Sequence, residues 1–392
     1  MPVLQKSSAK RRSRGGDFLA VLLLLAIVAG VGWLWWHQKH RRKPVKHHPA
    51  AVVQTEKKLP PIPVTVPPPV PIEKEKKPEP VVEKPIAVPP VIASNAIVLA
   101  PAVASEFPRP VRNLLEAQIA LARRAISPGS IDGAIGSQTR AALAAFQRSE
   151  QLLETGKLDT NTRTRLTLDA PLLTDYSVTT NDLSRLQPLG KTWLEKSRQS
   201  VLDYETILEL VAEKAHAHPL LVEKLNPGMD WLNMVAGTVL KIPEVNYPEP
   251  ADKAAFIIIQ LSEKFLEAFD ADTNLLAHFP CSIAAKVEKR PVGELHVVVI
   301  APNPNYTVNP ELFPESQELQ ALGHKLILPP GPNNPVGVAW IGLDKPGYGM
   351  HGTPVPEQVG RTESHGCFRL ANWDAEYLVK LVWIGMPVEV VP

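Results

Sequence analysis

The chain has 392 residues, enough for several domains, and its 44% hydrophobic and 21% charged residues are ordinary for a globular protein. Lys+Arg (42) and Asp+Glu (40) nearly cancel, leaving a formal net charge of +2, so no global basic field indicates nucleic-acid binding. The only cysteines are Cys281 and Cys367, which excludes a disulfide framework.

Residues 18–36 form an uncharged apolar run that would span about 28 Å as a helix. Tryptophans gather at its end, where indole rings favour a membrane interface. The run therefore predicts a single N-terminal transmembrane helix preceded by a cytoplasmic basic tail, residues 1–17. The alternative is a cleaved signal peptide, but that would have a shorter apolar core followed by a small-residue cleavage site. Five basic residues lie on each side, so charge does not decide the orientation.

Residues 37–105 read as a Pro-rich linker, with fourteen prolines between Pro44 and Pro90. Proline donates no backbone hydrogen bond and favours extended dihedrals, so this stretch predicts a semi-rigid spacer. Such a spacer would reach on the order of 100 Å when extended. A ligand for proline-binding modules is the competing interpretation.

Residues 106–172 have helical periodicity interrupted by the turn SIDGAIGSQT, whose glycines allow positive φ and whose Ser137 or Thr139 can start the next helix. These features predict a small α-helical domain. The strings IDGAIGSQTRAALAAFQ and LLETGKLDTNTRTRL resemble the peptidoglycan-binding domain type 1 family. The resemblance implies peptidoglycan as a partner, although most of the signature residues are structural.

Residues 173–246 predict a small α+β module, with helices near residues 207–211 and 220–225 and a strand over residues 237–243. The LN pair and the G-x-x-L-x-IP ending resemble a LysM module. The front of this stretch departs from that family, because its aromatic–valine strand and turn are weak.

Residues 251–392 contain β-branched runs over 255–259, 297–300 and 388–391, bounded by turn residues, and one helical stretch over 374–382. They predict a mostly β domain with a short helix. Within it, Cys367 is the best nucleophile, because a neighbouring imidazole can take the proton of a thiol. His351 lies sixteen residues upstream and needs the chain to fold back; His365 lies two residues upstream. The alternatives are His365 as the base, a zinc site, or an inert buried thiol.

Two short motifs resemble the YkuD-type L,D-transpeptidase family: the pair His351-Gly352, and the string Ser364-His365-Gly366-Cys367 with Arg369 after it. The resemblance implies a β-sandwich in which Cys367 attacks a stem-peptide carbonyl and His351 is general base and acid. It further implies that Gly352 or Ser364 orients the imidazole, that the Gly366 and Cys367 N–H groups stabilise the oxyanion, and that Arg369 holds a substrate carboxylate or braces its loop. The residues expected at the substrate are Trp340, Tyr348, Met350, His365 and Asn372.

The resulting hypothesis is a multi-domain peptidoglycan L,D-transpeptidase that works through an acyl-thioester and forms cross-links or attaches an envelope protein to the wall. A hydrolase acting on the same bonds shares every catalytic residue, and an inactive wall-binding anchor is the non-enzymatic alternative. Neither a metal-binding nor a nucleotide-binding motif is present in the sequence, so we expect no cofactor, and we expect no nucleic-acid partner. Because peptidoglycan lies outside the cytoplasmic membrane, we expect the protein in the inner membrane, with its C-terminal domains in the periplasm.

Overall fold

A computed structural model describes residues 106–362, 364 and 366–392. The basic tail, transmembrane helix and linker expected within residues 1–105 lie outside the described residues, and so does His365. Among the residues that are described, no helix is both long enough and apolar enough to cross a membrane.

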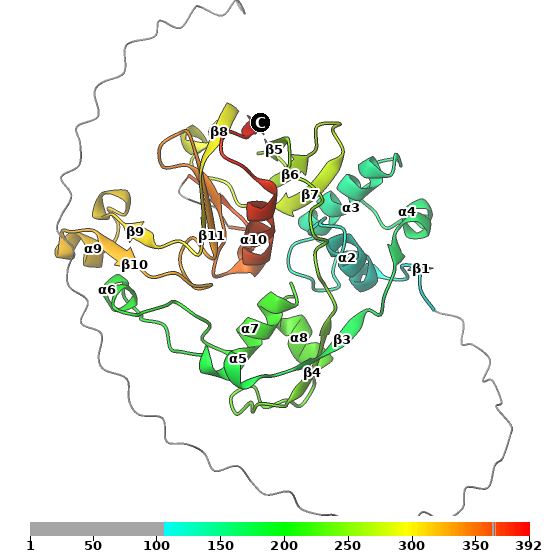
Figure 1. The fold of residues 1–392 in the computed structure, drawn as a ribbon, viewed down its shortest axis with the longest axis horizontal. Coiled ribbons are helices and arrows are strands. Elements are labelled where there is room, and N and C mark those ends of the chain that lie inside the picture. The colour runs from blue at the N-terminus through cyan, green and yellow to red at the C-terminus, as the bar shows by residue number, and fades with distance from the viewer. Residues whose placement is uncertain (1–105, 363, 365) are drawn as a thin grey trace, which may run out of the picture. The chain divides into compact units, whose positions relative to one another are not determined.

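The chain runs from helical elements through a small α/β module to a β-rich domain (Figure 1). The α-helices are α2 (Leu114–Ala122), α3 (Ser137–Ser149), α4 (Thr160–Arg165), α5 (Thr180–Ser184), α6 (Trp193–Ser197), α7 (Ile207–Lys214), α8 (Pro219–Leu225), α9 (Gln317–Leu322) and α10 (Asn372–Leu381). The first strands are β1 (Arg109–Pro110), β2 (Thr167–Leu168), β3 (Leu173–Ser177) and β4 (Val239–Pro243). The later strands are β5 (Phe256–Gln260), β6 (Phe265–Phe269), β7 (Leu275–Pro280), β8 (Gly293–Pro302), β9 (Tyr306–Val308), β10 (Leu326–Leu328), β11 (Ala339–Leu343), β12 (Gly349–His351), β13 (Phe368–Arg369) and β14 (Pro387–Val391).

The first module, residues 106–172, is helical as the sequence predicts, and α3 begins at the expected Ser137. Side-chain oxygens of Asn113 and Asp159 accept backbone N–H groups and so cap α2 and α4. The turn between α2 and α3 is held by a side chain of α2. The Gln118 amide oxygen accepts the N–H of Gly133 at 2.7 Å, and Gly133 has a φ of 77°, which glycine adopts without a Cβ clash.

The second module, residues 173–246, contains both predicted helices, as α7 and α8, and the predicted strand, as β4. The weak front of the sequence pattern nevertheless forms a strand, because β3 pairs antiparallel with β4 along its whole length. An excursion over residues 185–205, which carries α6, separates this strand from α7. Because this excursion separates β3 from α7 in the sequence, the strand-then-helix pattern of the module is hard to recognise from the sequence.

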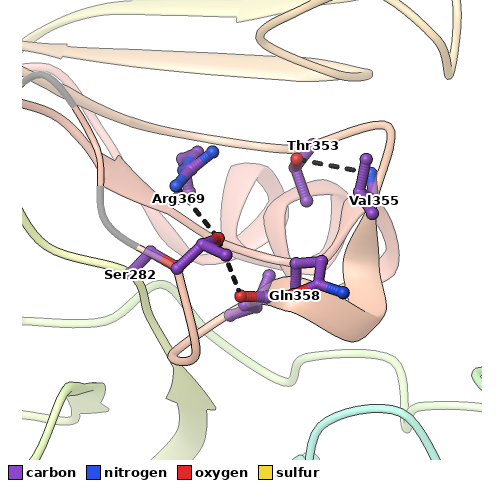
Figure 2. A pocket seen from close by; sticks show the side chains of 7 residues that line it. Ser282, Thr353, Val355, Gln358 and Arg369 are labelled. Carbon is purple, nitrogen blue, oxygen red and sulfur yellow. Dashed lines mark hydrogen bonds between the residues drawn. The ribbon is translucent and has the colours of Figure 1, made fainter.

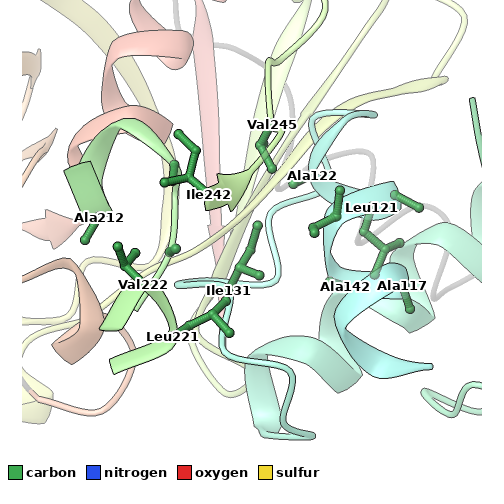
Figure 3. Close-up of a cluster of buried hydrophobic side chains, with 14 of the residues drawn as sticks. Ala117, Leu121, Ala122, Ile131, Ala142, Ala212, Leu221, Val222, Ile242 and Val245 are labelled. Atoms are coloured by element: carbon green, nitrogen blue, oxygen red, sulfur yellow. The ribbon is translucent and has the colours of Figure 1, made fainter. Parts of the chain in front are cut away.

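The two modules share one hydrophobic core, in which the α2–α3 turn inserts between them (Figure 3). Its members include Ala117, Leu121, Ile131, Ala142, Ala212, Leu221, Val222 and Ile242. The backbone continues the contact: the Ile131 N–H donates to the His216 carbonyl, and the His218 N–H donates to the Ile131 carbonyl, both at 2.9 Å. The modules therefore bury their apolar faces against each other instead of forming separate cores.

The third domain, residues 251–392, is mostly β, and α10 is the predicted helix. Its main sheet has eight strands in the order β13-β12-β11-β8-β14-β5-β6-β7. The strand β8 pairs with β14 through residues 293–296 and with β11 through residues 297–302, so β8 links the strands on its two sides into one mixed arrangement. The strands β9 and β10 pair separately with each other.

Buried polar contacts attach the third domain to the modules before it. The Ser127 N–H donates to the His278 carbonyl at 2.8 Å, so the helical module hydrogen-bonds to β7 at the end of the sheet. In the first turn of α10, the Asp374 carboxyl group accepts the Tyr247 hydroxyl at 2.6 Å and the Ser127 hydroxyl at 3.1 Å. Burial raises the pKa of Asp374 to about 7. The described residues accordingly belong to one compact unit.

This contact predicts how stability responds to substitution of Asp374. Asp374→Ala removes the acceptor of two buried hydroxyls and should lower the free energy of unfolding by about 2–3 kcal/mol, whereas Asp374→Asn keeps one acceptor and should cost less. Urea unfolding at fixed pH measures both.

The pH dependence of the same variants has a definite sign. The folded pKa of Asp374 lies above its ordinary value, so its favourable contribution is present below about pH 4 and is lost as the pH rises through about 7. The stability of wild type relative to Asp374→Asn should therefore fall between pH 5 and pH 8. A difference that grows with pH would contradict this assignment.

Candidate active site

His351 and Cys367 are brought together by the parallel pairing of β12 with β13 at one end of the sheet. Met350 pairs with Phe368 and His351 pairs with Arg369. Side chains alternate between the two faces of a strand, so Met350 and Phe368 enter the core while His351 and Arg369 share the opposite face. Cys367 directly precedes β13 and lies two residues before Arg369. The predicted fold-back of the chain is confirmed.

The His351 imidazole is held in one tautomer. Its Nδ1 lies 2.7 Å from the Gly352 carbonyl, which can only accept, so Nδ1 carries the proton and Nε2 is left as the basic nitrogen. The Trp340 ring stacks on the imidazole with ring centroids 5.6 Å apart. Burial lowers the pKa of His351 to about 4, opposed by the Gly352 hydrogen bond and assisted by the Arg369 charge. The imidazole is therefore neutral at physiological pH and can act as a base.

The Cys367 thiol is also neutral in the resting site. Its Sγ donates to the Gly347 carbonyl at 3.4 Å. Burial raises the pKa of Cys367 to about 11, against the opposing effects of the Gly349 backbone N–H and the Arg369 charge. At pH 7 such a thiol is ionised in roughly one molecule in ten thousand. Both pKa shifts favour a neutral thiol and a neutral imidazole over a thiolate–imidazolium pair.

The loop before β13 is braced by Ser364. The Ser364 hydroxyl donates to the Cys367 carbonyl at 2.6 Å and accepts the Gly366 N–H at 3.2 Å. Of the two groups expected to orient the imidazole, Gly352 makes the contact and Ser364 instead fixes the nucleophile's loop. The Gly366 N–H, expected at an oxyanion, is engaged with Ser364 in this state.

A pocket of about 300 Å³ lies beside this face (Figure 2). Its lining residues are Ser282, Thr353, Val355, Gln358, Val359, Thr362 and Arg369. The Arg369 guanidinium donates to the Thr362 hydroxyl at 3.3 Å, so the loop over residues 353–362 and β13 enclose the pocket together. A guanidinium at a mostly uncharged pocket is suited to a carboxylate ligand.

Comparison with known proteins identifies two segments of the chain. Residues 254–390 match the family model of the L,D-transpeptidase catalytic domain, and residues 112–166 match that of a peptidoglycan binding domain. Residues 254–390 therefore belong to the L,D-transpeptidase family. Its expected relation to both families is confirmed.

Three relatives are named as L,D-transpeptidases. YkuD of Bacillus licheniformis is 26% identical over 48% of this chain and 94% of its own length. YbiS of Escherichia coli K12 is 30% identical over 42% of this chain and 53% of its own length. YqjB of Bacillus subtilis is 35% identical over 25% of this chain and 49% of its own length. The chain thus spans about half the length of YbiS and of YqjB.

Two residues expected at the substrate are instead buried in the transpeptidase. Met350 is a core residue, because strand alternation points it away from the His351 face. Asn372 is 1% exposed, and its amide hydrogen-bonds to backbone groups and to the Glu213 carboxyl group. Trp340 stacks on His351, and Tyr348 lies beside Gly366, so substrate contact by these two rings stays a prediction.

Other residues at the site were not predicted. Tyr306, on β9, lies close enough to Cys367 for the thiolate charge to contribute, after burial, to a raised tyrosine pKa. Ser282, Gln358 and Thr362 line the pocket from two loops. None of them stands in a recognisable motif, and only the fold brings them near the nucleophile. Cys281 is a buried free thiol directly after β7.

The neutral resting site predicts an unusual pH dependence of thiol alkylation. Iodoacetamide reacts with thiolate, so Cys367 should react slowly at pH 7, and its rate should rise about tenfold per pH unit up to about pH 10. Mass spectrometry of the Cys281→Ala chain measures the rate at Cys367 alone. His351→Ala should keep the same slope. A rate that levels off near pH 7 would indicate a thiolate–imidazolium pair instead.

Proposed function

We propose that the chain is a cysteine-dependent L,D-transpeptidase that acts on peptidoglycan stem peptides through an acyl-thioester. The observation that carries the proposal is that His351 keeps Nε2 as a base on the same strand face as Cys367. The catalytic-domain and peptidoglycan-binding matches support the substrate class.

The first half-reaction forms the thioester. The Cys367 sulfur attacks the carbonyl between a diamino acid and a terminal D-alanine while His351 Nε2 takes the thiol proton. Because both groups start neutral, proton transfer accompanies the attack instead of preceding it. The tetrahedral intermediate then expels the D-alanine amine, which takes the proton back from the imidazole as the C–N bond breaks.

The second half-reaction transfers the acyl group. An acceptor amine loses a proton to His351 and attacks the thioester, the C–S bond breaks, and the proton returns to the sulfur. The acceptor is a second stem peptide or an envelope protein. Backbone N–H groups of Gly366 and Cys367 stabilise the oxyanion in both steps once substrate displaces the contact between Gly366 and Ser364. Arg369 binds a substrate carboxylate in the adjoining pocket.

The reaction is tested with disaccharide-tetrapeptide fragments of purified wall, analysed by mass spectrometry. Cys367→Ala should abolish both D-alanine release and dimer formation, a loss of at least about a thousandfold. Cys281→Ala is the matched control and should retain both. Dimers would support transfer, and shortened monomers alone would support the hydrolase. Turnover that survives in Cys367→Ala would overturn the cysteine mechanism and leave the wall-binding anchor as the alternative.

The proposed location follows from the substrate. Peptidoglycan lies outside the cytoplasmic membrane, so residues 18–36 anchor the chain in the inner membrane and the residues after them lie in the periplasm. The Pro-rich linker carries the catalytic domain outward, while the peptidoglycan-binding and LysM-like modules contact the wall.

This topology is tested with a reporter fused after Pro49. Alkaline phosphatase, which folds only in an oxidising compartment, should be active there. Green fluorescent protein fused at the same position and exported through the general secretory pathway should stay dark. The reverse pattern would place the catalytic domain in the cytoplasm and contradict the proposal.

A further inference from the structure

A carboxyl group from the second module contacts the catalytic domain. Glu213, on α7, accepts both hydrogen bonds that the Asn372 amide nitrogen offers to it, at 3.2 Å to Oε1 and 3.0 Å to Oε2. The Tyr204 hydroxyl donates to Oε1 of the same carboxyl group at 2.9 Å. The Asn372 nitrogen also donates to the Pro332 carbonyl at 3.1 Å. Glu213 is thus tied to the first residue of α10.

The orientation of the Asn372 amide follows from these partners. The amide nitrogen faces the two oxygens of Glu213 and the Pro332 carbonyl, so the amide oxygen faces the other way. Burial raises the pKa of Glu213 to about 7, and the hydrogen bonds from Asn372 and Tyr204 oppose this shift. A flipped amide would set its oxygen against the Pro332 carbonyl and the Glu213 carboxyl group. Glu213 therefore favours, together with Pro332, one of the two amide orientations.

The Asn372 oxygen in turn holds the backbone of the catalytic loop. It accepts the Thr353 N–H at 3.0 Å and the Val338 N–H at 3.3 Å. Gly337 and Gly352 pack so closely on this oxygen that a Cβ at either position would collide with it. The oxygen is thus locked between two backbone segments.

The same catalytic segment holds the imidazole. The peptide group between Gly352 and Thr353 presents its N–H to Asn372 and its carbonyl to Nδ1 of His351. One rigid peptide plane therefore links the amide to the base. A rotation of this plane would move the acceptor that fixes the imidazole tautomer and ring direction.

We propose that Glu213 is a positioning residue for the transpeptidase, acting through Asn372 and the Gly352–Thr353 peptide to hold His351 in its productive orientation. The inference rests on the proposed role of His351 as the base. It gives the second module a part in catalysis that is separate from any binding of glycan.

Neighbouring contacts support a fixed relation between α7 and the catalytic loops. One turn earlier on α7, Glu209 accepts the Asn333 amide at 2.6 Å. The Leu202 N–H donates to the Pro330 carbonyl and the Asn333 N–H donates to the Leu202 carbonyl, each at 2.9 Å. The segment before Asn334 is therefore anchored to the second module at several points, and Glu213 is the contact that continues to the base.

The test measures acylation of the full chain by the carbapenem imipenem, as the rate constant per titratable Cys367. Glu213→Ala should slow acylation by roughly tenfold to a hundredfold, because small misplacements of a base are costly. Glu213→Gln keeps an acceptor for the Asn372 nitrogen and should recover most of the rate. Glu205→Ala is the matched control, since its exposed carboxylate accepts the Leu189 N–H instead, and it should match wild type.

A pH profile separates positioning from loss of folded protein. In Glu213→Ala a loosened, better hydrated imidazole should regain part of its ordinary pKa, so the acid limb of the acylation profile should move upward from about pH 4. A rate per active site and a pH profile equal to wild type would overturn the positioning role. Absence of acylation in wild type would overturn the proposed function itself, and the two failures are thereby distinguishable.

Discussion

The site depends on two residue pairs in a very short parallel ladder. Met350 pairs with Phe368 and His351 pairs with Arg369, and these pairs set which side chains face the core and which face the pocket. A slip of one residue would send His351 inward and Met350 outward. The apolar pair resists such a slip, because both side chains are almost completely buried. Core packing and catalytic geometry are thus one constraint.

Burial has a second consequence, which is chemical. The surroundings that fix His351 and Cys367 also disfavour charge on either group, so the pKa of His351 is lowered and the pKa of Cys367 is raised. In a thiolate–imidazolium pair, each charge would shift the pKa of the other group in the opposite direction. A neutral thiol resists adventitious oxidation and alkylation. The reaction then relies on a substrate whose carbonyl is placed close enough for attack and proton transfer to occur together. Such a thiol reacts slowly with general electrophiles and depends on a bound donor peptide for its reaction.

The sequence allowed much of this to be predicted, for identifiable reasons. Short motifs carry Cys367 and His351, and β-branched runs mark β5, β8 and β14, because both signals are local. The linkage of the strands was not predictable, because it depends on β8 pairing with β14 through its first residues and with β11 through its last ones. Nor were the roles of Met350 and Asn372, because closeness to a motif in sequence does not reveal the direction of a side chain. Tyr306 was missed because a separate strand pair supplies it.

The turn between α2 and α3 illustrates how one signature can have two uses. Its residues resemble a wall-binding family, yet Ser127 bonds to His278 and Asp374, and Ile131 bonds to the backbone of the second module. Groups committed to these contacts are not available to a glycan. In the rest of the turn, a hollow lined by Asp132, Ser137 and Arg361 opens next to the catalytic loop. This hollow and the pocket that contains Arg369 are adjacent, because Arg361 lines the first, Thr362 lines the second, and the two residues are neighbours in the chain. The same segment of the catalytic domain therefore meets the helical module on one side and the pocket on the other.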